Sequence, residues 1–354
     1  MESLLFSMYQ DALVQQSGTF SAIVTSLRLD CAGPAPEVRP QYCFASTDEE
    51  ATGLVKWKAT FHNENNSLLA SWTLSTDACR DDWYGIICIN GRINRLNIAN
   101  VGVTGTLYDF PFSSLPFLEY VDLSMNQLFG PIPPELGKMK SLEIGGSIPP
   151  EIGNVKGLLG LDLSSNHLIG QIPKEFGKLT SLIRLLVQNN SISGNIPGEF
   201  VSLAKLESLD LSDNRLNGMI PTCIGDFVHL FQLDLSNNKF GENIPIEIGK
   251  MTQLNVLDLS HNLLVGDIPP QLANLKVLVD LNLSHNCLSG HIPEEVESMT
   301  GLQVVFLSYN ELEGPIPNNK AFITASLQGN KGLCGNLTGF QPCERPSKHS
   351  IVKR

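Results

Sequence analysis

Two histidines in this chain are spaced in a way that can support chemistry. His261 and His285 are 24 residues apart, and each follows a polar residue three positions earlier, Asp258 and Asn282. Imidazoles brought together in this way can bind a metal ion or respond to pH near neutrality. No third ligand is evident in the sequence, so we expect a solvated pair and no metal site.

Two other segments resemble phosphate-binding loops. Gly130 to Lys138 and Gly170 to Lys178 each hold a second glycine, but six residues separate the two glycines. The loop of nucleotide-binding enzymes has the shorter pattern GxxxxGK and then Ser or Thr, whereas Met139 or Leu179 follows here. Kinase motifs, GxSxG and HExxH are absent too. We therefore predict no enzymatic activity and no cofactor.

Eight cysteines indicate the redox setting. Six stand in short-spaced pairs, none of which is CxxC: Cys31 and Cys43, Cys79 and Cys88, Cys334 and Cys343. Zinc-ribbon and thioredoxin-like sites therefore lack support. Short-spaced pairs near the chain ends suit disulfides, which form in an oxidising compartment. The isolated Cys223 and Cys287 are expected to be small apolar core residues.

Charge and hydropathy restrict the partners. The chain has 24 Lys and Arg against 36 Asp and Glu, a net charge of −12, which disfavours nucleic acid as a partner. No window approaches the ~18 apolar residues that a membrane-spanning helix needs. The first residues make a poor signal peptide, because Glu2 and Asp11 interrupt them and no early Lys or Arg is present.

The elements that must position these residues come from a repeat. Seven asparagines recur every 24 residues: Asn166, Asn190, Asn214, Asn238, Asn262, Asn286 and Asn310. Around each runs LxxLxLxxN, followed by Gly and then Ile-Pro, which is the pattern of a leucine-rich repeat. Alternate Leu side chains of a short strand turn inward, and stacked coils bury them. The Asn can satisfy backbone groups between successive coils.

This pattern predicts a right-handed, mainly β leucine-rich-repeat solenoid of the α/β class. A parallel sheet should line its concave face, with 3-10 or other short helices on the convex side. The Gly-x-Ile-Pro element resembles the plant-specific type of this repeat, which implies a second row of short strands.

The flanking segments resemble the caps of plant leucine-rich-repeat receptor-like kinase ectodomains. Upstream, LLASW precedes Cys79, Trp83, Gly85 and Cys88, and downstream GNKGLCG precedes Cys343. The resemblance covers residues from about 46 to 345. It implies the disulfides Cys79–Cys88 and Cys334–Cys343, with free buried thiols as the alternative.

The expected organisation follows from these segments. Residues 1–45 are atypical and expected to be poorly ordered, 46–90 form the amino-terminal cap, and 91–318 hold about ten repeats. Residues 319–345 form the carboxy-terminal cap, and 346–354 are a basic tail. In the resembling receptors such a tail leads into a membrane helix and a kinase, and membrane association would need that downstream helix.

One repeat is clipped. Counting back from Asn166 by 24 residues reaches Leu142, and the preceding ladder residue is Asn126. Residues 141–149 pass from the start of one repeat straight to its Gly-x-Ile-Pro end, without a strand. A 16-residue coil is too short for a full turn, so we expect the sheet to be interrupted or strained near 140–150.

The outward strand positions are the candidate binding surface. One stripe of equivalent positions holds Asp122, Asp162, Leu186, Asp210, Asp234, Asp258, Asn282 and Phe306. It is either an acidic track for a basic or polar ligand or simply the preferred strand sequence of the repeat. Departures from the repeat are more informative. They are Arg184, Leu186 and Gln188 in one coil, Phe231 and Gln232 in another, and Val304, Phe306 and Tyr309 in the last.

Two further features bear on these surfaces. Many receptors of the resembling family carry an Arg-x-Arg pair on one strand, whereas here Leu185 and Leu186 follow Arg184. Glycosylation sequons occur at Asn65, Asn189, Asn282 and Asn336, although chance sequons are equally expected.

The resemblance implies a function in plant signalling. It indicates the ligand-sensing ectodomain of a receptor-like serine/threonine kinase, which binds a peptide or protein ligand and a co-receptor kinase. The expected location is the extracellular side of the plasma membrane. One alternative is a secreted cell-wall defence protein similar to polygalacturonase inhibitors, and another is a nonfunctional truncated product.

Overall fold

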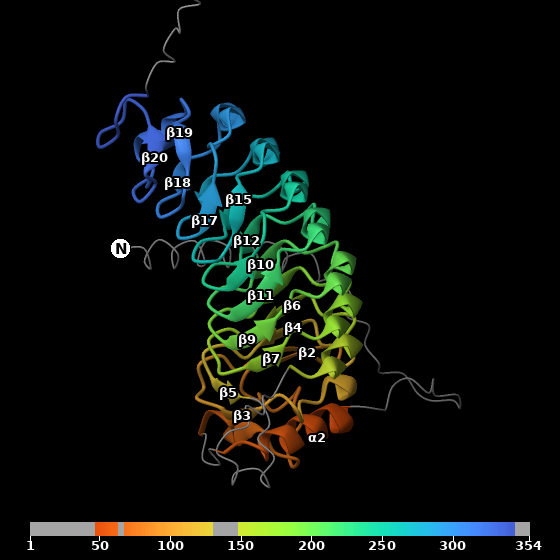
Figure 1. The fold of residues 1–354 in the computed structure, drawn as a ribbon. Coiled ribbons are helices and arrows are strands. Elements are labelled where there is room, and N and C mark those ends of the chain that lie inside the picture. Colours follow the sequence, from red (N-terminus) through yellow and green to blue (C-terminus); the bar gives the residue numbers. More distant parts are fainter. Residues whose placement is uncertain (1–46, 63–66, 130–147, 344–354) are drawn as a thin grey trace, which may run out of the picture. The chain divides into compact units, whose positions relative to one another are not determined.

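The computed structural model describes residues 47–62, 67–129 and 148–343. These residues form a stack of coils, each passing through a strand, a second short strand and a 3-10 helix (Figure 1). This confirms the predicted solenoid. Within the described ranges, no helix combines the length and the apolarity needed to cross a bilayer.

The main sheet has ten strands, and all except the antiparallel β1–β2 pair run parallel. Its neighbours follow chain order: β1 (Ile86–Ile89), β2 (Arg92–Asn97), β4 (Tyr120–Asp122), β6 (Gly160–Asp162), β8 (Arg184–Leu186), β10 (Ser208–Asp210), β12 (Gln232–Asp234), β14 (Val256–Asp258), β16 (Asp280–Asn282) and β18 (Val304–Phe306).

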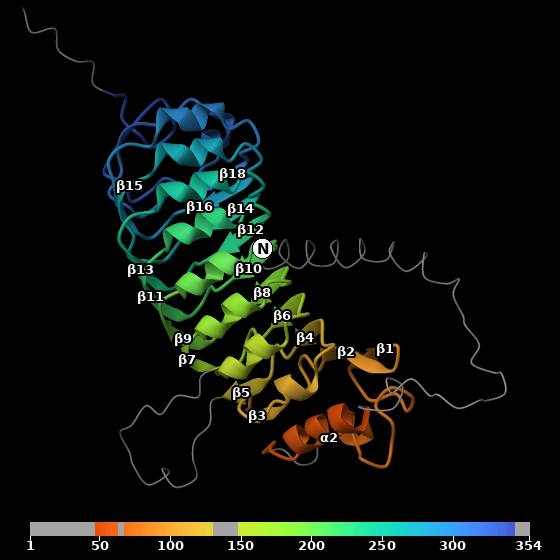
Figure 2. The same ribbon diagram turned by 90° about the vertical axis from the view of Figure 1, so that its right-hand side faces the viewer.

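The second row of short strands predicted from Gly-x-Ile-Pro is present. It holds β3 (Thr104–Thr106), β5 (Gln127–Phe129), β7 (Ile169–Gln171), β9 (Ser191–Gly194), β11 (Arg215–Met219), β13 (Lys239–Gly241), β15 (Val265–Asp267), β17 (Cys287–Ser289), β19 (Glu313–Pro315) and β20 (Gly332–Cys334). Figure 2 shows this row and the main sheet on opposite sides of the stack, with helices between them.

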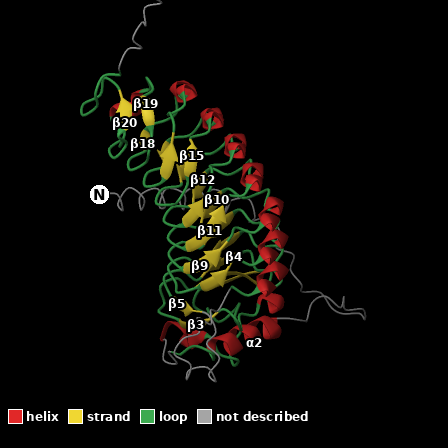
Figure 3. Ribbon diagram, viewed as in Figure 1, coloured by secondary structure: helices red, strands yellow, loops and turns green. Residues whose placement is uncertain are grey.

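The helices are short apart from α2 (Thr47–Lys58) in the amino-terminal cap, and most stack along one side of the coils (Figure 3). The 3-10 helices are η2 (Ser67–Ser71), η3 (Phe112–Ser114), η5 (Pro150–Asn154), η6 (Lys174–Lys178), η7 (Gly198–Ser202), η8 (Thr222–Asp226), η9 (Ile246–Lys250), η10 (Pro270–Asn274), η11 (Glu294–Ser298) and η12 (Lys320–Ile323).

The coils are held together by leucine burial and by the asparagine ladder. Leu209 and Leu211 are fully buried, as the alternation predicts. The Asn214 amide nitrogen donates to the carbonyl of Val187 in the previous coil at 3.0 Å, and its oxygen accepts from the N–H of Ile192 at 2.9 Å. The ladder asparagine therefore satisfies backbone groups that the coil would otherwise bury unpaired.

The glycine of Gly-x-Ile-Pro has two reasons to be glycine. Gly218 has φ +77°, a left-handed conformation that L side chains rarely adopt. A Cβ atom there would also lie 2.5 Å from the Asn195 side-chain oxygen of the previous coil. The equivalent position in the next coil is Glu242, which keeps a φ of +60° without being glycine.

Both predicted disulfides, Cys79–Cys88 and Cys334–Cys343, are present. In the amino-terminal cap the carboxylate of Glu50, fully buried, accepts from Arg92 Nε at 2.8 Å and from the N–H of Ile93 at 3.0 Å. This ties α2 to β2, the second strand of the main sheet.

The prediction that Cys287 belongs to the core is wrong. Cys287 is exposed, because β17 alternates and its inward residue is Leu288. Cys223 is half-buried, and Cys31 and Cys43 lie outside the described residues.

The prediction of an interrupted sheet is also wrong. β4 pairs directly with β6, and Val121 stands opposite Leu161. Ile148, from the second of two Gly-x-Ile-Pro copies, is buried in the coil. The sheet stays continuous because β4 and β6 are adjacent strands, so the chain makes one coil between Asn126 and Asn166. Most of the clipped segment, residues 141–147, lies outside the described residues.

Candidate ligand-binding face

The outward positions of the main sheet form two registered rows. Row A holds Arg95, Tyr120, Gly160, Arg184, Ser208, Gln232, Val256, Asp280 and Val304. Row B, two residues later on each strand, holds Asn97, Asp122, Asp162, Leu186, Asp210, Asp234, Asp258, Asn282 and Phe306.

The aspartates of row B each use one oxygen within their own coil. In five coils Oδ1 accepts from the N–H of the serine two residues later, at 2.9–3.1 Å. Oδ2 of Asp258 accepts from Asn282 Nδ2 at 2.8 Å. No hydrogen bond from the described part of the chain reaches Oδ2 of Asp210 or Asp234. The repeat therefore explains one oxygen of each aspartate. The second oxygen lacks a donor in both Asp210 and Asp234, but Asp210 is buried, so only the half-buried Asp234 can offer it to a ligand.

Several of these carboxyls have raised pKa values. Burial raises the pKa of Asp210 to about 6, and the charges of Asp213 and Asp162 act in the same direction. Burial also raises the pKa of Asp234 well above its usual range, with repulsion from Asp210 and Asp258 adding to the effect. Burial and then Asp258 raise the pKa of Asp280. A positive charge near this column would lower these pKa values.

Row C lies at the rim where the chain leaves the strands. Its residues precede the ladder asparagines and all have positive φ: Met125, Ser165, Asn189, Asp213, Asn237, His261, His285 and Tyr309. The rings of His261 and His285 stack with centroids 4.1 Å apart, and Tyr309 continues the stack at 4.4 Å. Burial and then the His261 charge lower the pKa of His285. Within the described residues, no group of three His, Cys, Asp or Glu could hold a metal ion.

The remaining predicted site residues lie on or beside this face. Arg184 is exposed, whereas Phe231 and Gln232 are half-buried. Gln188 is half-buried, and its Oε1 atom has no hydrogen-bond partner in the described structure. Arg184 and Gln188 lie in the coil of β8 and Phe231 and Gln232 in the coil of β12, with the coil of β10 between them, so the structure brings them to one surface without direct contact between the two strands.

At the carboxy-terminal end, Val304 and Phe306 are each 37 % exposed and Tyr309 is 51 % exposed. The cap continues the backbone pairing there, because the N–H of Leu307 donates to the carbonyl of Ser326 at 2.8 Å. Phe322 of the cap is buried. The cap therefore closes the coil but leaves the Phe306 ring open to solvent.

Sequence reasoning missed an arrangement at the amino-terminal end. The Arg95 guanidinium lies over the Tyr120 ring, 4.4 Å from its centroid. A Cβ atom on Gly160 would lie 2.8 Å from Tyr120 Cδ1, so the ring leans over the glycine. Arg95 and Tyr120 occupy equivalent places on the adjacent strands β2 and β4, upstream of the clipped repeat, and that equivalence was the signal available in the sequence.

The sequons differ in their surroundings. Asn189 and Asn336 are exposed. The Asn282 amide binds Asp258 through nitrogen and Ser284 through oxygen, so a glycan there would disturb both contacts. Asn65 lies outside the described residues.

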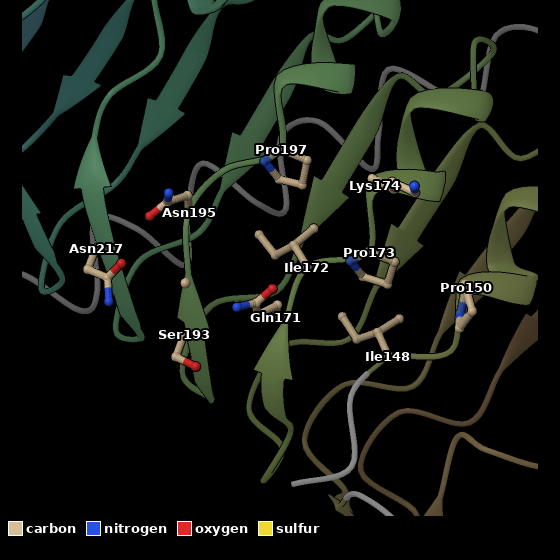
Figure 4. Close-up of a pocket in the computed structure, with 11 residues that line it drawn as sticks. Ile148, Pro150, Gln171, Ile172, Pro173, Lys174, Ser193, Asn195, Pro197 and Asn217 are labelled. Carbon is tan, nitrogen blue, oxygen red and sulfur yellow. The ribbon is translucent and has the colours of Figure 1, made fainter.

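An open groove of about 720 Å³ lies elsewhere, between the short strands β7, β9 and β11 and the start of the 3-10 helices (Figure 4). Gln171, Ser193, Asn195 and Asn217 line its polar side, and Ile148, Ile172 and prolines line the rest. None of the predicted site residues lines this groove, and it lacks the charge pattern of rows A and B.

Family models match much of the chain. Two of them are described as leucine rich repeat. The first matches residues 182–240 and 252–312, and the second matches residues 117–139 and 157–179. A third, the leucine rich repeat N-terminal domain, matches 47–89. The Arabidopsis thaliana MDIS1-interacting receptor like kinase 2 is 43 % identical over 123 residues, which is 34 % of this chain and 11 % of that protein. The chain thus spans a small part of that relative.

This chain is also similar to solved structures of plant leucine-rich-repeat proteins. The ectodomain of the Arabidopsis thaliana receptor kinase GASSHO1/SCHENGEN3, in complex with CASPARIAN STRIP INTEGRITY FACTOR 2, is 32 % identical with TM-score 0.68, covering 76 % of this chain and 30 % of that one. The Arabidopsis receptor kinase HAESA, with the peptide hormone IDA and the co-receptor SERK1, is 28 % identical with TM-score 0.60, covering 79 % and 49 %. A plant ice-binding protein is 27 % identical with TM-score 0.59, covering 84 % and 98 %.

Proposed function

This chain belongs to the leucine-rich-repeat family, with repeats and caps of the plant receptor-kinase type, and we propose that it is the ligand-binding ectodomain of a plant receptor-like serine/threonine kinase. It binds a peptide or protein ligand on rows A and B and engages a co-receptor kinase near β18. It carries out no chemistry itself.

One observation carries this proposal. The outward side chains of the main sheet depart from the repeat where packing does not require it, and the departures lie on one face of the sheet between β8 and β18. They include Arg184, Gln232 and Phe306. Exposed aromatic and arginine side chains are the groups that most often dominate protein interfaces. Solved neighbours that hold a peptide hormone have the same fold.

The organisation proposed for the receptor follows the sequence analysis. Residues 46–90 and 319–345 act as caps at the two ends of the repeats of 91–318. They cover the leucine rows that the terminal coils would otherwise expose. We assign the chain to the extracellular side of the plasma membrane, with glycans at the exposed Asn189 and Asn336. Two disulfides within the caps support an oxidising location.

Ternary complex formation tests the function. The chain, immobilised, is exposed to the SERK1 ectodomain and other co-receptor ectodomains, with and without a pool of small secreted plant peptides. We expect a co-receptor to bind only when the peptide pool is present. Ile246→Ala changes an exposed aliphatic residue on η9, away from rows A and B. As a control for surface substitution, this variant should bind the co-receptor in the presence of peptide as the parent chain does. Absence of peptide-dependent binding across the panel would contradict the proposal.

One comparison favours a second candidate, a soluble binding protein of the cell wall. The chain covers 98 % of the ice-binding protein, so a solenoid of this extent can act without a kinase. Inhibition of polygalacturonase, or of ice recrystallisation, by the purified chain at micromolar concentration would support this candidate over the receptor.

A further inference from the structure

The binding face differs in charge along its length. At the amino-terminal end, the exposed Arg95 and Arg184 are the only basic residues of rows A and B, and neither forms an ion pair within the described structure. Stacking on Tyr120 holds the Arg95 guanidinium flat on the face. Asp122 and Asp162 lie beside them and are half-buried, as most aspartates of the middle coils are, so the exposed charges at this end are those of the two arginines. We call this end, from β2 to β8, the arginine zone.

The middle of the face is acidic. From β10 to β16, rows A and B carry four aspartates and no basic residue. Asp234, Asp258 and Asp280 are half-buried and reach the surface, whereas Asp210 is buried beneath it. Oδ1 of Asp280 is buried without a hydrogen-bond partner in the described structure. Buried carboxylate oxygens without donors are costly unless a cation or donor reaches them. This aspartate zone therefore lacks the positive charge that a ligand can supply.

The carboxy-terminal end of the face is apolar. Val304, Phe306 and Tyr309 form this aromatic zone, and each is more than a third exposed. Tyr309 is also the last ring of the stack that begins at His261. The stack limits the freedom of the Tyr309 side chain, so little rotamer entropy would be lost when a partner packs against it.

Strand spacing gives the length of a ligand that reaches all three zones. Eight spacings separate β2 from β18, and at about 4.8 Å each they span roughly 38 Å. An extended peptide rises about 3.3 Å per residue, so about 12 residues cover this distance. Such a peptide crosses the strands and presents its side chains to one zone after another.

We propose that this face binds an extended peptide of about 12 residues with its charges in a fixed order: acidic residues over the arginine zone, Lys or Arg over the aspartate zone, and an apolar or aromatic residue over the aromatic zone. This inference rests on the proposed function and adds the chemical class of the ligand. The order can run in either chain direction, because the zones fix charge and not the direction of the peptide backbone.

A selection from random 12-residue peptides displayed on phage tests this order. Folded chain with both disulfides intact is the bait, and the enriched sequences are read out by position. At these spacings we expect acidic residues to be enriched in about five positions at one end, Lys and Arg in about the next five, and apolar residues in about the last one or two positions at the other end. One enriched peptide and a version with the same composition but permuted order are then compared by calorimetry. We expect the permuted peptide to bind at least tenfold more weakly.

Variants assign each part of the order to its zone. Asp234→Lys should abolish the central enrichment of Lys and Arg, and Arg95→Glu should abolish the terminal enrichment of acidic residues. Glu294→Lys makes the same change from negative to positive charge as Asp234→Lys, but at an exposed position on η11. It should leave both the central and the terminal enrichment unchanged. Melting curves of all variants verify that they fold.

The outcomes separate this inference from the proposed function. Enrichment of peptides without the charge order, or equal affinity of the permuted peptide, would overturn the inference while leaving a peptide-binding ectodomain in place. No enrichment of any peptide would overturn both.

Discussion

The Asn166 side-chain amide donates to the carbonyl of Leu123, 43 positions earlier, at 3.0 Å. In the following coil Asn190 makes the same contact to Leu163, 27 positions earlier, at the same distance. The hydrogen bond between coils therefore has the same length whether 27 or 43 positions of the chain separate the two residues. The long connection between Asn126 and Asn166 leaves the ladder and the sheet continuous.

Deleting residues 131–146 should leave a stable and more regular solenoid. Gly130 would then precede Ser147-Ile148-Pro149, which restores a coil of 24 residues. Shortening a connection from 40 to 24 residues lowers the entropic cost of bringing its ends together on folding. The free energy of unfolding should therefore rise by about 0.5 kcal/mol. Urea denaturation measures this change. Inserting eight residues between Glu143 and Ile144 serves as the comparison and should not stabilise. Loss of a single cooperative transition on deletion would show that the segment contributes to the fold.

Replacing one ladder asparagine should be strongly destabilising. Asn214→Ala removes four hydrogen bonds to buried backbone groups of two coils. Leaving several such groups unpaired should cost about 2–4 kcal/mol of unfolding free energy. Asn217→Ala, at an exposed position on β11, should change it by less than about 0.5 kcal/mol. Equal effects of the two substitutions in thermal melts would contradict the structural role of the ladder.

Glu242→Gly should stabilise the protein. Glu242 has φ +60°, where the equivalent positions of the flanking coils hold Gly218 and Gly266. A left-handed conformation costs an L residue roughly 1–2 kcal/mol, which glycine relieves. The greater entropy of an unfolded chain with glycine offsets only part of this gain. The expected net gain is about 0.5–1 kcal/mol. Glu242→Gln keeps the backbone preference and removes the charge, so a gain with this control as well would point to charge rather than conformation.

The raised pKa of Asp210 should appear in the pH dependence of stability. With a folded pKa of about 6 and an ordinary value of 3.8, the folded state binds more protons between these values. Stability contributed by this group is therefore present below about pH 4 and is lost as pH rises to 6. The loss should be on the order of 2–3 kcal/mol. Asp210→Asn should remove this dependence when unfolding curves of both proteins are compared from pH 4 to 7, and parallel curves would contradict the shift.

Phe306→Ala and Tyr309→Ala should each weaken co-receptor binding by about 1–3 kcal/mol while the fold stays intact, because exposed aromatic anchors dominate many interfaces. Titration calorimetry against the co-receptor ectodomain measures the loss. Val277→Ala, an exposed aliphatic residue elsewhere on the coil, should bind as the parent does. A lowered melting point of Phe306→Ala with unaltered affinity would instead mean that the ring supports the cap.

The sequence by itself determined the solenoid, the second row of strands, the ladder asparagines and the two disulfides. The solenoid and the ladder depend on residues close together in the chain and repeated at one period, such as Leu209, Leu211 and Asn214, so that pattern needs no knowledge of distant contacts. The second row of strands and the two disulfides followed instead from the resemblance of Gly-x-Ile-Pro and of the flanking segments to the plant receptor type. The stripe of Asp210, Asp234 and Asp258 follows from the period, since equal spacing places them on adjacent strands.

The tertiary structure alone decided how the coils align across the clipped repeat. Two copies of Gly-x-Ile-Pro, at 130–133 and 146–149, fit the local pattern equally well, and the choice depends on which strand can bury its leucines against the next coil. That choice makes Gly160 the neighbour of Tyr120 and so brings the Arg95–Tyr120 pair onto the same face as Arg184. The exposure of Phe306 was likewise decided by the cap, because packing between segments far apart in sequence, and not residue type, determines which apolar side chains remain in solvent.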